Sequence, residues 1–214
     1  MTTTKDYDYL NRVTQISCVG ATGSIPSQFG YQYNDANQRT RVTLADGSYW
    51  IYDYDSLGQV KSGKRYWSDG TPVAGQQFEY SFDTIGNRKS AASGGDENGA
   101  NLRYANYTVS RTNMYTSREV PPYLDVLGIA RVDATVTVQG SAAGVYRHGE
   151  YFRKEQYVNN TSAAQYPTLS VDTDVTSPVS GEKFLAYKPG ELQPRRGREP
   201  DAGRAMGLHV GHGR

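Results

Sequence analysis

The sequence predicts an all-β protein made of consecutive antiparallel hairpins, and three observations support this prediction. Tyrosine occurs 18 times, against 5 Phe and 2 Trp, and aromatic residues are enriched in strands. Asp-Gly pairs separate strand-like runs, which is the strongest short-range signal of a hairpin. No window shows the i, i+3, i+4, i+7 apolar pattern of an amphipathic helix, so almost no helix is expected.

A short motif recurs between residues 7 and 88. It consists of aromatic residues, an Asp or Asn, and a turn residue three positions later. The four copies are Tyr7–Asn11, Tyr31–Asn37, Tyr52–Gly58 and Tyr80–Gly86. Successive copies are spaced within the range of roughly 20 to 50 residues that is typical of repeat architectures.

Each copy is interpreted as the end of a strand followed by a tight turn. Aromatic residues two positions apart point to one face of a strand. The aspartate can bond the backbone two residues on, and glycine or asparagine can then adopt positive φ. The residues predicted to build the repeat are Tyr7, Asp8, Asn11, Tyr31, Tyr33, Asn37, Tyr52, Tyr54, Asp55, Gly58, Tyr80, Phe82, Asp83 and Gly86.

A second type of turn is predicted between the copies, at Asp46-Gly47 and Asp69-Gly70. Each repeat would then hold two strands and two turns. The paired tyrosines are expected to form ladders between neighbouring strands, with their hydroxyl groups at the wet edge.

The motifs Tyr54-Asp55-x-x-Gly58 and Phe82-Asp83-x-x-Gly86-Asn87-Arg88 resemble the tyrosine–aspartate (YD) repeats of RHS proteins. The stretch from Asn106 to Thr116 is similar to a segment found between such repeats. The resemblance covers roughly residues 5–120 and predicts a repeat domain over residues 5–117.

The resemblance implies a curved sheet that forms part of a hollow shell around a cargo polypeptide, on a secreted or cell-surface protein. This role is steric, with no catalysis and no cofactor. Other repeats of a parent chain, or self-association through open strand edges, would supply the partners. No Asp-Pro pair of the family's self-cleavage motif occurs in the sequence, and the chain starts inside a repeat. We therefore expect a fragment without the protease core or the toxin domain.

The remaining sequence predicts three further segments. Residues 90–100 are small, polar and glycine-rich and predict a loop. Residues 124–187 predict a small sandwich-like antiparallel β unit, in which Val132–Val138 alternates as a strand does. Residues 190–214 are rich in Arg, Gly and Pro and predict a disordered basic tail.

One alternative function comes from another class. Trp50 and Trp67 would be the first candidates for stacking on sugars in a carbohydrate-binding module. Asp53, Asp55 and Asp83 fit no calcium-loop pattern, and turn formation explains them better.

Other site classes find little support in the sequence. His148 and Cys18 lie in no metal or nucleophile motif, so no metal site and no catalytic residue is predicted. The formal net charge of +1 gives no case for nucleic acid. No apolar run reaches membrane length, and the N-terminus shows no signal peptide, so localisation rests on the resemblance alone.

Overall fold

The computed structural model describes residues 2–20, 27–188, 190–191 and 207–209. The regular structure of these residues is β-strand, and they contain no helix, which confirms the predicted all-β class. The chain divides into two compact units. Unit 1 holds Met1–Ser81 and Gly95–Leu102, and unit 2 holds Phe82–Gly94 and Arg103–Arg214. The domain limits predicted from the sequence, 5–117 and 124–187, stay a prediction.

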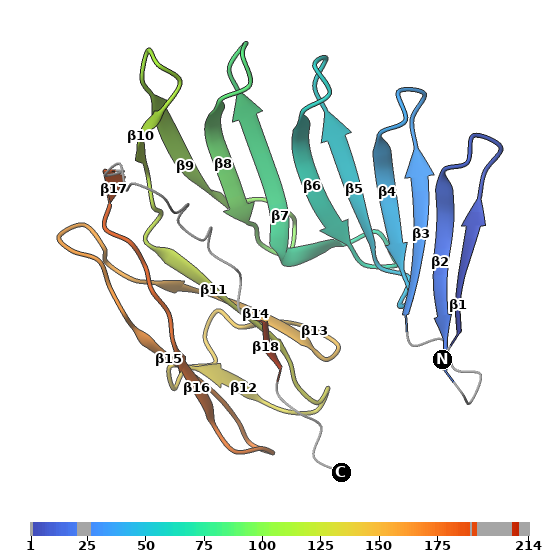
Figure 1. Ribbon diagram of the computed structural model, residues 1–214. Helices are drawn as coiled ribbons and strands as arrows, with labels where there is room; N and C mark the ends of the chain where they lie inside the picture. Colours follow the sequence, from blue (N-terminus) through green and yellow to red (C-terminus); the bar gives the residue numbers. More distant parts are fainter. Residues whose placement is uncertain (1, 21–26, 189, 192–206, 210–214) are drawn as a thin grey trace. The chain divides into compact units, whose positions relative to one another are not determined.

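Unit 1 is a series of hairpins in chain order (Figure 1). Each strand pairs antiparallel with the next one in the sequence. The strands are β1 (Thr2–Tyr7), β2 (Val13–Val19), β3 (Ser27–Tyr33), β4 (Arg39–Leu44), β5 (Tyr49–Tyr54), β6 (Val60–Tyr66) and β7 (Pro72–Phe82), the last of which ends where unit 2 begins. This arrangement confirms the prediction of consecutive hairpins.

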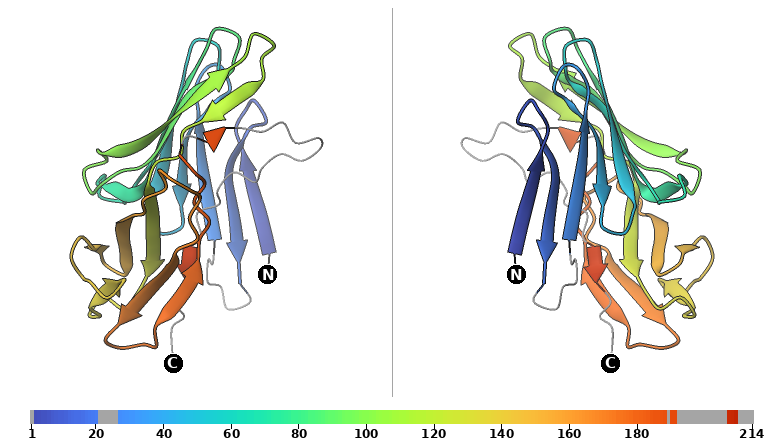
Figure 2. Two further views of the ribbon diagram at one scale, coloured as in Figure 1. Left: turned by 90° about the vertical axis from the view of Figure 1, so that its left-hand side faces the viewer. Right: turned by 90° about the vertical axis from the view of Figure 1, so that its right-hand side faces the viewer.

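The pairing shifts by one position near the end of β1, β3 and β5. The irregularities lie between Asp6 and Tyr7, between Gln32 and Tyr33, and between Asp53 and Tyr54. An extra residue in one strand bends it and increases its right-handed twist. The side views in Figure 2 show the strands of unit 1 rotated relative to one another.

The register gives the sheet of unit 1 two chemically different faces. Tyr31, Val42 and Trp50 lie opposite one another on β3, β4 and β5, so their side chains share a face, here called the aromatic face. Phe29, Tyr52 and Phe78 also lie on it. The opposite face, here called the polar face, carries residues such as Arg41, Ile51 and Lys64.

Unit 2 contains two sheets besides the last hairpin strands. The strands are β8 (Arg88–Gly94), β9 (Leu102–Val109), β10 (Tyr115–Arg118), β11 (Tyr123–Ile129), β12 (Val136–Val138), β13 (Tyr146–His148), β14 (Tyr151–Tyr157), β15 (Thr168–Thr173), β16 (Val179–Glu182), β17 (Gly190–Glu191) and β18 (Gly207–His209). One sheet has the order β13-β14-β11-β18 and the other the order β12-β15-β16, while β10 pairs with β9 and β17.

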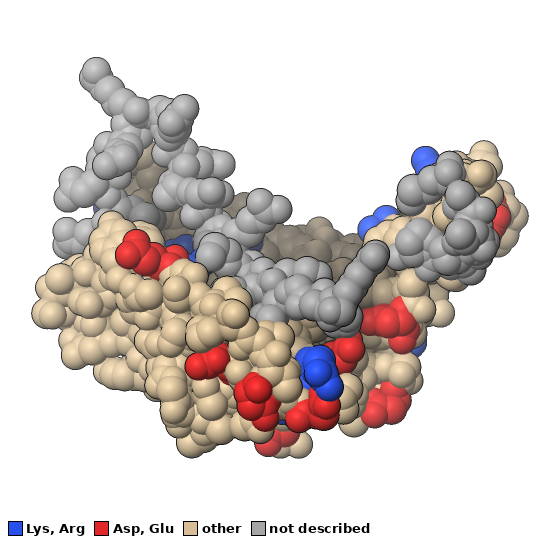
Figure 3. All heavy atoms as spheres, turned by 90° about the horizontal axis from the view of Figure 1, so that it is seen from below, with Lys and Arg blue, Asp and Glu red and all other residues tan. Residues whose placement is uncertain are grey.

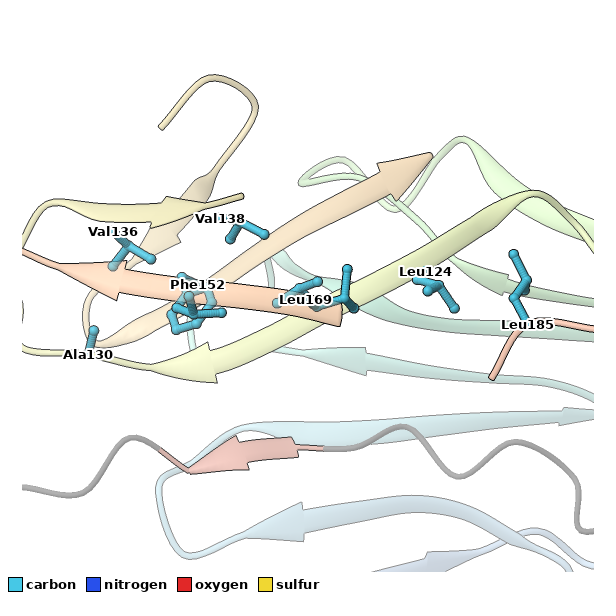
Figure 4. Close-up of a cluster of buried hydrophobic side chains, with 9 residues drawn as sticks. Leu124, Ala130, Val136, Val138, Phe152, Leu169 and Leu185 are labelled. Atoms are coloured by element: carbon cyan, nitrogen blue, oxygen red, sulfur yellow. The ribbon is translucent and has the colours of Figure 1, made fainter. Parts of the chain in front are cut away.

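The main hydrophobic core lies between these two sheets (Figure 4). Phe152 of β14 is fully buried, with 0% of its surface exposed. The cluster consists of Leu124, Val126, Ala130, Val136, Val138, Phe152, Leu169, Val171 and Leu185. Because its members come from β11 and β14 on one side and from β12 and β15 on the other, the predicted sandwich-like packing is confirmed.

Two predictions of local structure were wrong in part. Residues 90–94, predicted as loop, belong to strand β8; Ala92 is 2% exposed, because the small side chains of this segment fit a crowded site. The strand predicted over Val132–Val138 is formed only at Val136–Val138, because Arg131 to Ala134 closes a turn instead. Strand β18 lies outside the predicted unit of residues 124–187 and pairs parallel with β11.

The predicted disordered tail, residues 190–214, lies mostly outside the described residues. Within it, the structure describes the short strands β17 and β18. Charges do not gather into one field on the face seen in Figure 3, where acidic and basic side chains form small separate groups among the described residues. No helix in the described part has the length and apolarity needed to cross a bilayer.

Candidate functional site: the repeated hairpin loop and its tyrosine

One backbone loop closes hairpin after hairpin in this chain. In the copy at Asp55, the Asp55 N–H donates to the Gln59 carbonyl at 2.9 Å, and the Gly58 N–H donates to the Asp55 carbonyl at 3.1 Å. Equivalent pairs of bonds define loops that begin at Asp8, Asn34, Leu44, Trp67, Asp83, Asp96 and Ser110. The pattern is that of a type I turn followed by a bulge residue in the left-handed region.

Glycine or asparagine occupies the left-handed position of each loop. The φ angle is 82° at Gly58 and 92° at Gly86, and it is 59° at Asn11 and 60° at Asn37. These are the residues that the sequence assigned to positive φ. A β-carbon in this region normally collides with the neighbouring carbonyl, which glycine avoids and asparagine tolerates best.

An acidic or hydroxyl side chain caps the start of most of these loops. Asp55 Oδ1 accepts hydrogen bonds from the N–H groups of Leu57 and Gln59, both at 2.9 Å. Asp8, Asp83 and Asp96 cap their own loops in the same way. Their oxygens are thus used by the local backbone, as the sequence predicted for a turn-forming aspartate.

The loop hydrogen bonds also fix the charge of two of these carboxylates. The Asn87 side chain donates to Asp83 at 2.8 Å; this bond, together with those from the backbone, lowers the pKa of Asp83. Burial acts to raise the pKa of Asp8, but hydrogen bonds from Arg12 and Leu10 outweigh it and the net pKa is lowered. Among the described residues, no group of three or more His, Cys, Asp or Glu side chains could hold a metal ion.

The motif tyrosine at the end of a hairpin's first strand bonds the preceding hairpin. Tyr33 Oη donates to the Val13 carbonyl at 2.7 Å, and Tyr54 Oη donates to the Arg39 carbonyl at 2.7 Å. Each accepting carbonyl belongs to the second residue after the left-handed residue of the earlier loop, Asn11 or Asn37. These two hydroxyl groups are therefore structural donors that join neighbouring hairpins.

The other motif aromatics differ from these two. Tyr7 is 55% exposed, and its hydroxyl has no partner among the described residues. Phe82 has no hydroxyl to donate. Tyr52 lies on the aromatic face opposite Gly63, and burial raises the pKa of Tyr52.

Arginine side chains connect neighbouring hairpins near the same loops. Arg12 Nε donates to Asp8 at 2.7 Å, Arg12 Nη1 donates to Asn37 Oδ1 at 2.8 Å, and the guanidinium lies 4.9 Å from the centre of the Tyr33 ring. A single side chain thus contacts two successive loops. Cation–π contacts of this kind recur where Arg39 lies over Tyr31 and where Arg41 lies over Tyr49.

The opposite end of the hairpins uses a different cap. In the Asp46-Gly47 and Asp69-Gly70 turns, aspartate accepts a bond from the backbone N–H two residues later and another from that residue's hydroxyl group. Gly47 and Gly70 have φ angles of 79° and 89°. Both predicted turns lie where the sequence placed them.

The two tryptophans suggested for sugar stacking lie within other contacts. The ring of Trp50 stacks on Phe78, 6.0 Å between centroids, and on Tyr52 at 6.4 Å. Trp67 is partly buried and lies 6.0 Å from the Arg65 guanidinium. Both rings are partly buried and held in these contacts, so the structure gives no support to the carbohydrate alternative.

A network of four charges in unit 2 was not predicted. Arg153 bonds Asp125 at 2.6 Å and Glu155 at 3.3 Å, and Arg103 contacts Glu155 at 2.5 Å. Burial raises the pKa of Asp125, while the charge of Arg153 opposes this shift. Each carboxylate has an arginine partner, so the network joins β9, β11 and β14 and is not a pair poised for acid–base catalysis.

Sequence reasoning missed two of the repeated loops. Asp96 begins one of them inside the segment predicted only as an unspecified loop, and Ser110 begins another with its hydroxyl as cap. Neither follows a tyrosine directly. The sequence feature that could have located these two loops is the glycine or asparagine three positions after the first loop residue. Gly99 and Asn113 occupy this position and have positive φ. The other singled-out residues, His148 and Cys18, belong to β13 and β2.

Comparison with known proteins gives one match over the hairpins described above. Residues 33–72, which run from the end of β3 to the start of β7, match the family model called RHS Repeat. This stretch is therefore similar to an RHS repeat. No curated protein matches the whole chain or a part of it.

The solved structures that match the chain include three that contain TccC3. A crystal structure of TcdB2-TccC3-Cdc42 matches with a TM-score of 0.39 and 12% identity, and one of TcdB2-TccC3-TEV with 0.37 and 11%. The Photorhabdus luminescens Tc holotoxin pore with a TccC3 mutation matches with 0.38 and 12%. Each match covers 83% of this chain but 9% of the other chain.

Proposed function

We propose that this chain is a non-catalytic piece of a β-shell wall that encloses a cargo polypeptide, within a secreted or cell-surface RHS-type protein. The observation that carries the proposal is the bond from the motif tyrosine of one hairpin to the backbone of the previous one. The bond occurs in two successive hairpins, at Tyr33 and Tyr54, and in both it joins the hairpin to the one before it in the chain.

The chemistry of the hairpins supports a steric role. Loop carboxylates are used by their own backbone, and the four-charge network is internally neutralised by arginine, so the described residues present no free acid–base pair in either place. The sheet of unit 1 has an aromatic face and a polar face, and a wall needs two such different sides. An unfolded cargo exposes apolar side chains that an aromatic surface can cover.

A protease-protection experiment tests the proposal. The full chain is mixed with reduced, carboxymethylated α-lactalbumin as an unfolded cargo, and the lifetime of the cargo under dilute proteinase K is measured. We expect the chain to prolong this lifetime several-fold. Equal lifetimes with and without the chain would contradict the proposal.

Two matched variants identify the cargo side of the wall. Phe29 on the aromatic face is 37% exposed and Ile51 on the polar face is 40% exposed, so each can be changed to serine with little effect on packing. We expect Phe29→Ser to shorten the cargo lifetime and Ile51→Ser to leave it unchanged. The reverse result would place the cargo on the polar face.

A further inference from the structure

The two faces of the unit 1 sheet differ in the sign of the charges that they carry. The register places all three acidic residues of the described strands β1 to β7 on the polar face: Asp6, Asp53 and Glu79. The aromatic face carries Lys5 and Arg65 instead, in register with Phe29 and Trp50. Acidic strand residues are thus kept off the aromatic face.

Arg39 adds a third positive charge to the aromatic face. It lies at the register shift between β3 and β4, so it does not follow the simple alternation from Arg41. Its guanidinium lies 4.2 Å from the centre of the Tyr31 ring. Burial raises the pKa of Tyr52 and the charge of Arg39 acts against this shift, so Arg39 also lies close to Tyr52. The three side chains form one basic and aromatic site.

Lysine side chains neutralise two of the carboxylates of the polar face. Lys64 Nζ lies 2.6 Å from a carboxylate oxygen of Glu79, and Lys61 Nζ lies 3.2 Å from one of Asp53. Charges of opposite sign therefore lie side by side there. Such a mixed surface gives a charged partner little net attraction.

The cations of the aromatic face are compensated less. Lys5 and Arg39 are exposed, and neither has a carboxylate partner among the described residues. Arg65 lies 3.7 Å from Asp46, while its shorter bond, at 2.9 Å, goes to the neutral hydroxyl group of Ser48. The face therefore keeps a positive charge beside its rings.

An aromatic surface with uncompensated cations fits an apolar polypeptide that also carries carboxylates. Trp50 stacks on Tyr52 and on Phe78, and such rings can cover apolar side chains. Arginine can bond a carboxylate through two of its N–H groups. Single-stranded nucleic acid also combines stacking with negative charge, but its affinity depends on many phosphate contacts. The few cations of this face favour a polypeptide.

We infer that the aromatic face of unit 1 binds unfolded polypeptide segments that combine apolar side chains with aspartate or glutamate, and that Arg39 pairs with one of these carboxylates. The inference rests on the proposed wall function and names the class of cargo that this wall holds. Segments rich in lysine or arginine are disfavoured at the same place, because like charges repel one another.

Two matched peptides test the charge preference. One consists of Phe-Ser-Glu-Ser repeats, and the other has lysine in place of each glutamate; both carry the same fluorescent label. Fluorescence anisotropy measures their affinity for the full chain at low and at high salt. We expect the acidic peptide to bind several-fold more tightly at low salt and the difference to shrink at high salt, because salt screens exposed charges. Equal affinities, or tighter binding of the basic peptide, would overturn the inference.

Arg39→Gln and Arg41→Gln are a matched pair of variants. Both arginines belong to β4 and lie over a tyrosine ring, Tyr31 or Tyr49, but those rings are on opposite faces. Arg39→Gln should weaken binding of the acidic peptide about two- to fivefold, as expected for an exposed ion pair, and Arg39→Lys should retain most of the affinity. Arg41→Gln should change nothing. Equal losses in the two glutamine variants would implicate overall charge and overturn the inference.

Two further outcomes separate this inference from its alternatives. If an oligothymidylate bound more tightly than the acidic peptide, the face would be assigned to nucleic acid and the inference would fail. Protection of α-lactalbumin together with equal peptide affinities would leave the proposed wall function standing and overturn the cargo preference alone. A clear acidic preference without protection would support binding by this face and contradict the wall function.

Discussion

The hairpins of unit 1 and the sandwich of unit 2 are both built from antiparallel strands, yet different residues hold them together. The sandwich contains the hydrophobic cluster around Phe152, with large apolar side chains from two facing sheets. In the hairpins, the fully buried side chains include Ser48 and Gln77, exposed by 1% each. Capped loops, tyrosine hydroxyls and stacked rings therefore stabilise the hairpins, whereas the sandwich is stabilised by apolar side chains that fill the space between its two sheets.

This difference explains how the sheet of unit 1 stays ordered although the main hydrophobic cluster lies in unit 2. A hydrophobic core gains from burial of apolar area, which is non-directional. Hydrogen bonds from a cap or a tyrosine are directional, and they contribute about 1 kcal/mol each. Because the loop caps recur in most hairpins and the tyrosine bond recurs in two, the sum of these contributions grows with the number of hairpins, as in other repeat proteins.

Phe152→Ala is the largest single change that we predict. Deleting a fully buried phenylalanine costs roughly 3–5 kcal/mol, and the loss should be confined to unit 2. Both tryptophans lie in unit 1, so tryptophan fluorescence during urea unfolding reports on the hairpins, while hydrogen exchange at β11 and β14 reports on the sandwich. The matched control is Phe184→Ala, since Phe184 is 53% exposed. An equal shift of both signals in Phe152→Ala would show that the two units unfold together.

Asp55→Ala should be the most damaging change to a single loop. It leaves the N–H groups of Leu57 and Gln59 without their acceptor, at a cost of about 1–2 kcal/mol. Asp55→Asn is the control, because an amide oxygen caps the equivalent loop at Asn34, and it should cost far less. Urea unfolding followed by tryptophan fluorescence measures both. If the two variants were equally destabilised, charge and not capping would be the cause.

Tyr54→Phe should have a smaller effect, about 1 kcal/mol, because it removes one hydrogen bond to the Arg39 carbonyl and keeps the ring. Tyr52→Phe, on the same strand and face, should be close to neutral since no bond of its hydroxyl is seen in the described residues. The same fluorescence measurement applies. A neutral Tyr54→Phe would remove the basis for the tyrosine as a link between hairpins.

The smallest effect expected is a difference in pH dependence. Burial raises the pKa of Asp125 above its unfolded value, so the folded state binds the proton more tightly and this group adds stability as the pH falls through the folded pKa. The lowered pKa of Asp83 acts in the opposite sense: its stability is present above the unfolded pKa and is lost as the pH falls through the folded one.

Urea unfolding at a series of pH values measures these contributions. On acidification from neutral pH, Asp125→Asn should lack the gain of the natural chain, and Asp83→Asn should lack part of the loss at the acidic end. Parallel pH curves for the natural chain and both variants would show that neither carboxylate is linked to folding.

Much of the hairpin region could be predicted because its signals are local. Asp55 and Gly58 lie in one loop, and the Asp-Gly turns mark their own positions. The loop at Ser110 was missed because a hydroxyl replaced the expected carboxylate there. Strand β8 was missed because small residues favour loops by composition, and only its crowded surroundings make them suitable for a strand.

The charge network of unit 2 could not be predicted for a different reason. Arg103, Asp125 and Glu155 are far apart in the sequence, and none of them belongs to a motif. Only the pairing of β11 with β14, register included, brings Asp125 opposite Glu155. Packing decides the register between strands that are far apart in the sequence. The periodicity within one segment therefore does not reveal which residue of a distant strand lies opposite.

The pairing of β1 to β7 strictly in chain order also has a kinetic consequence. Each hairpin closes between residues that leave the ribosome within moments of each other, and hairpins form within about 1–10 μs. The sheet of unit 2 differs, since β11 pairs with β18, whose residues 207–209 are synthesised much later than residues 127–129. During translation the hairpins can therefore close one after another, while β18 can join β11 only after residues 207–209 have been made.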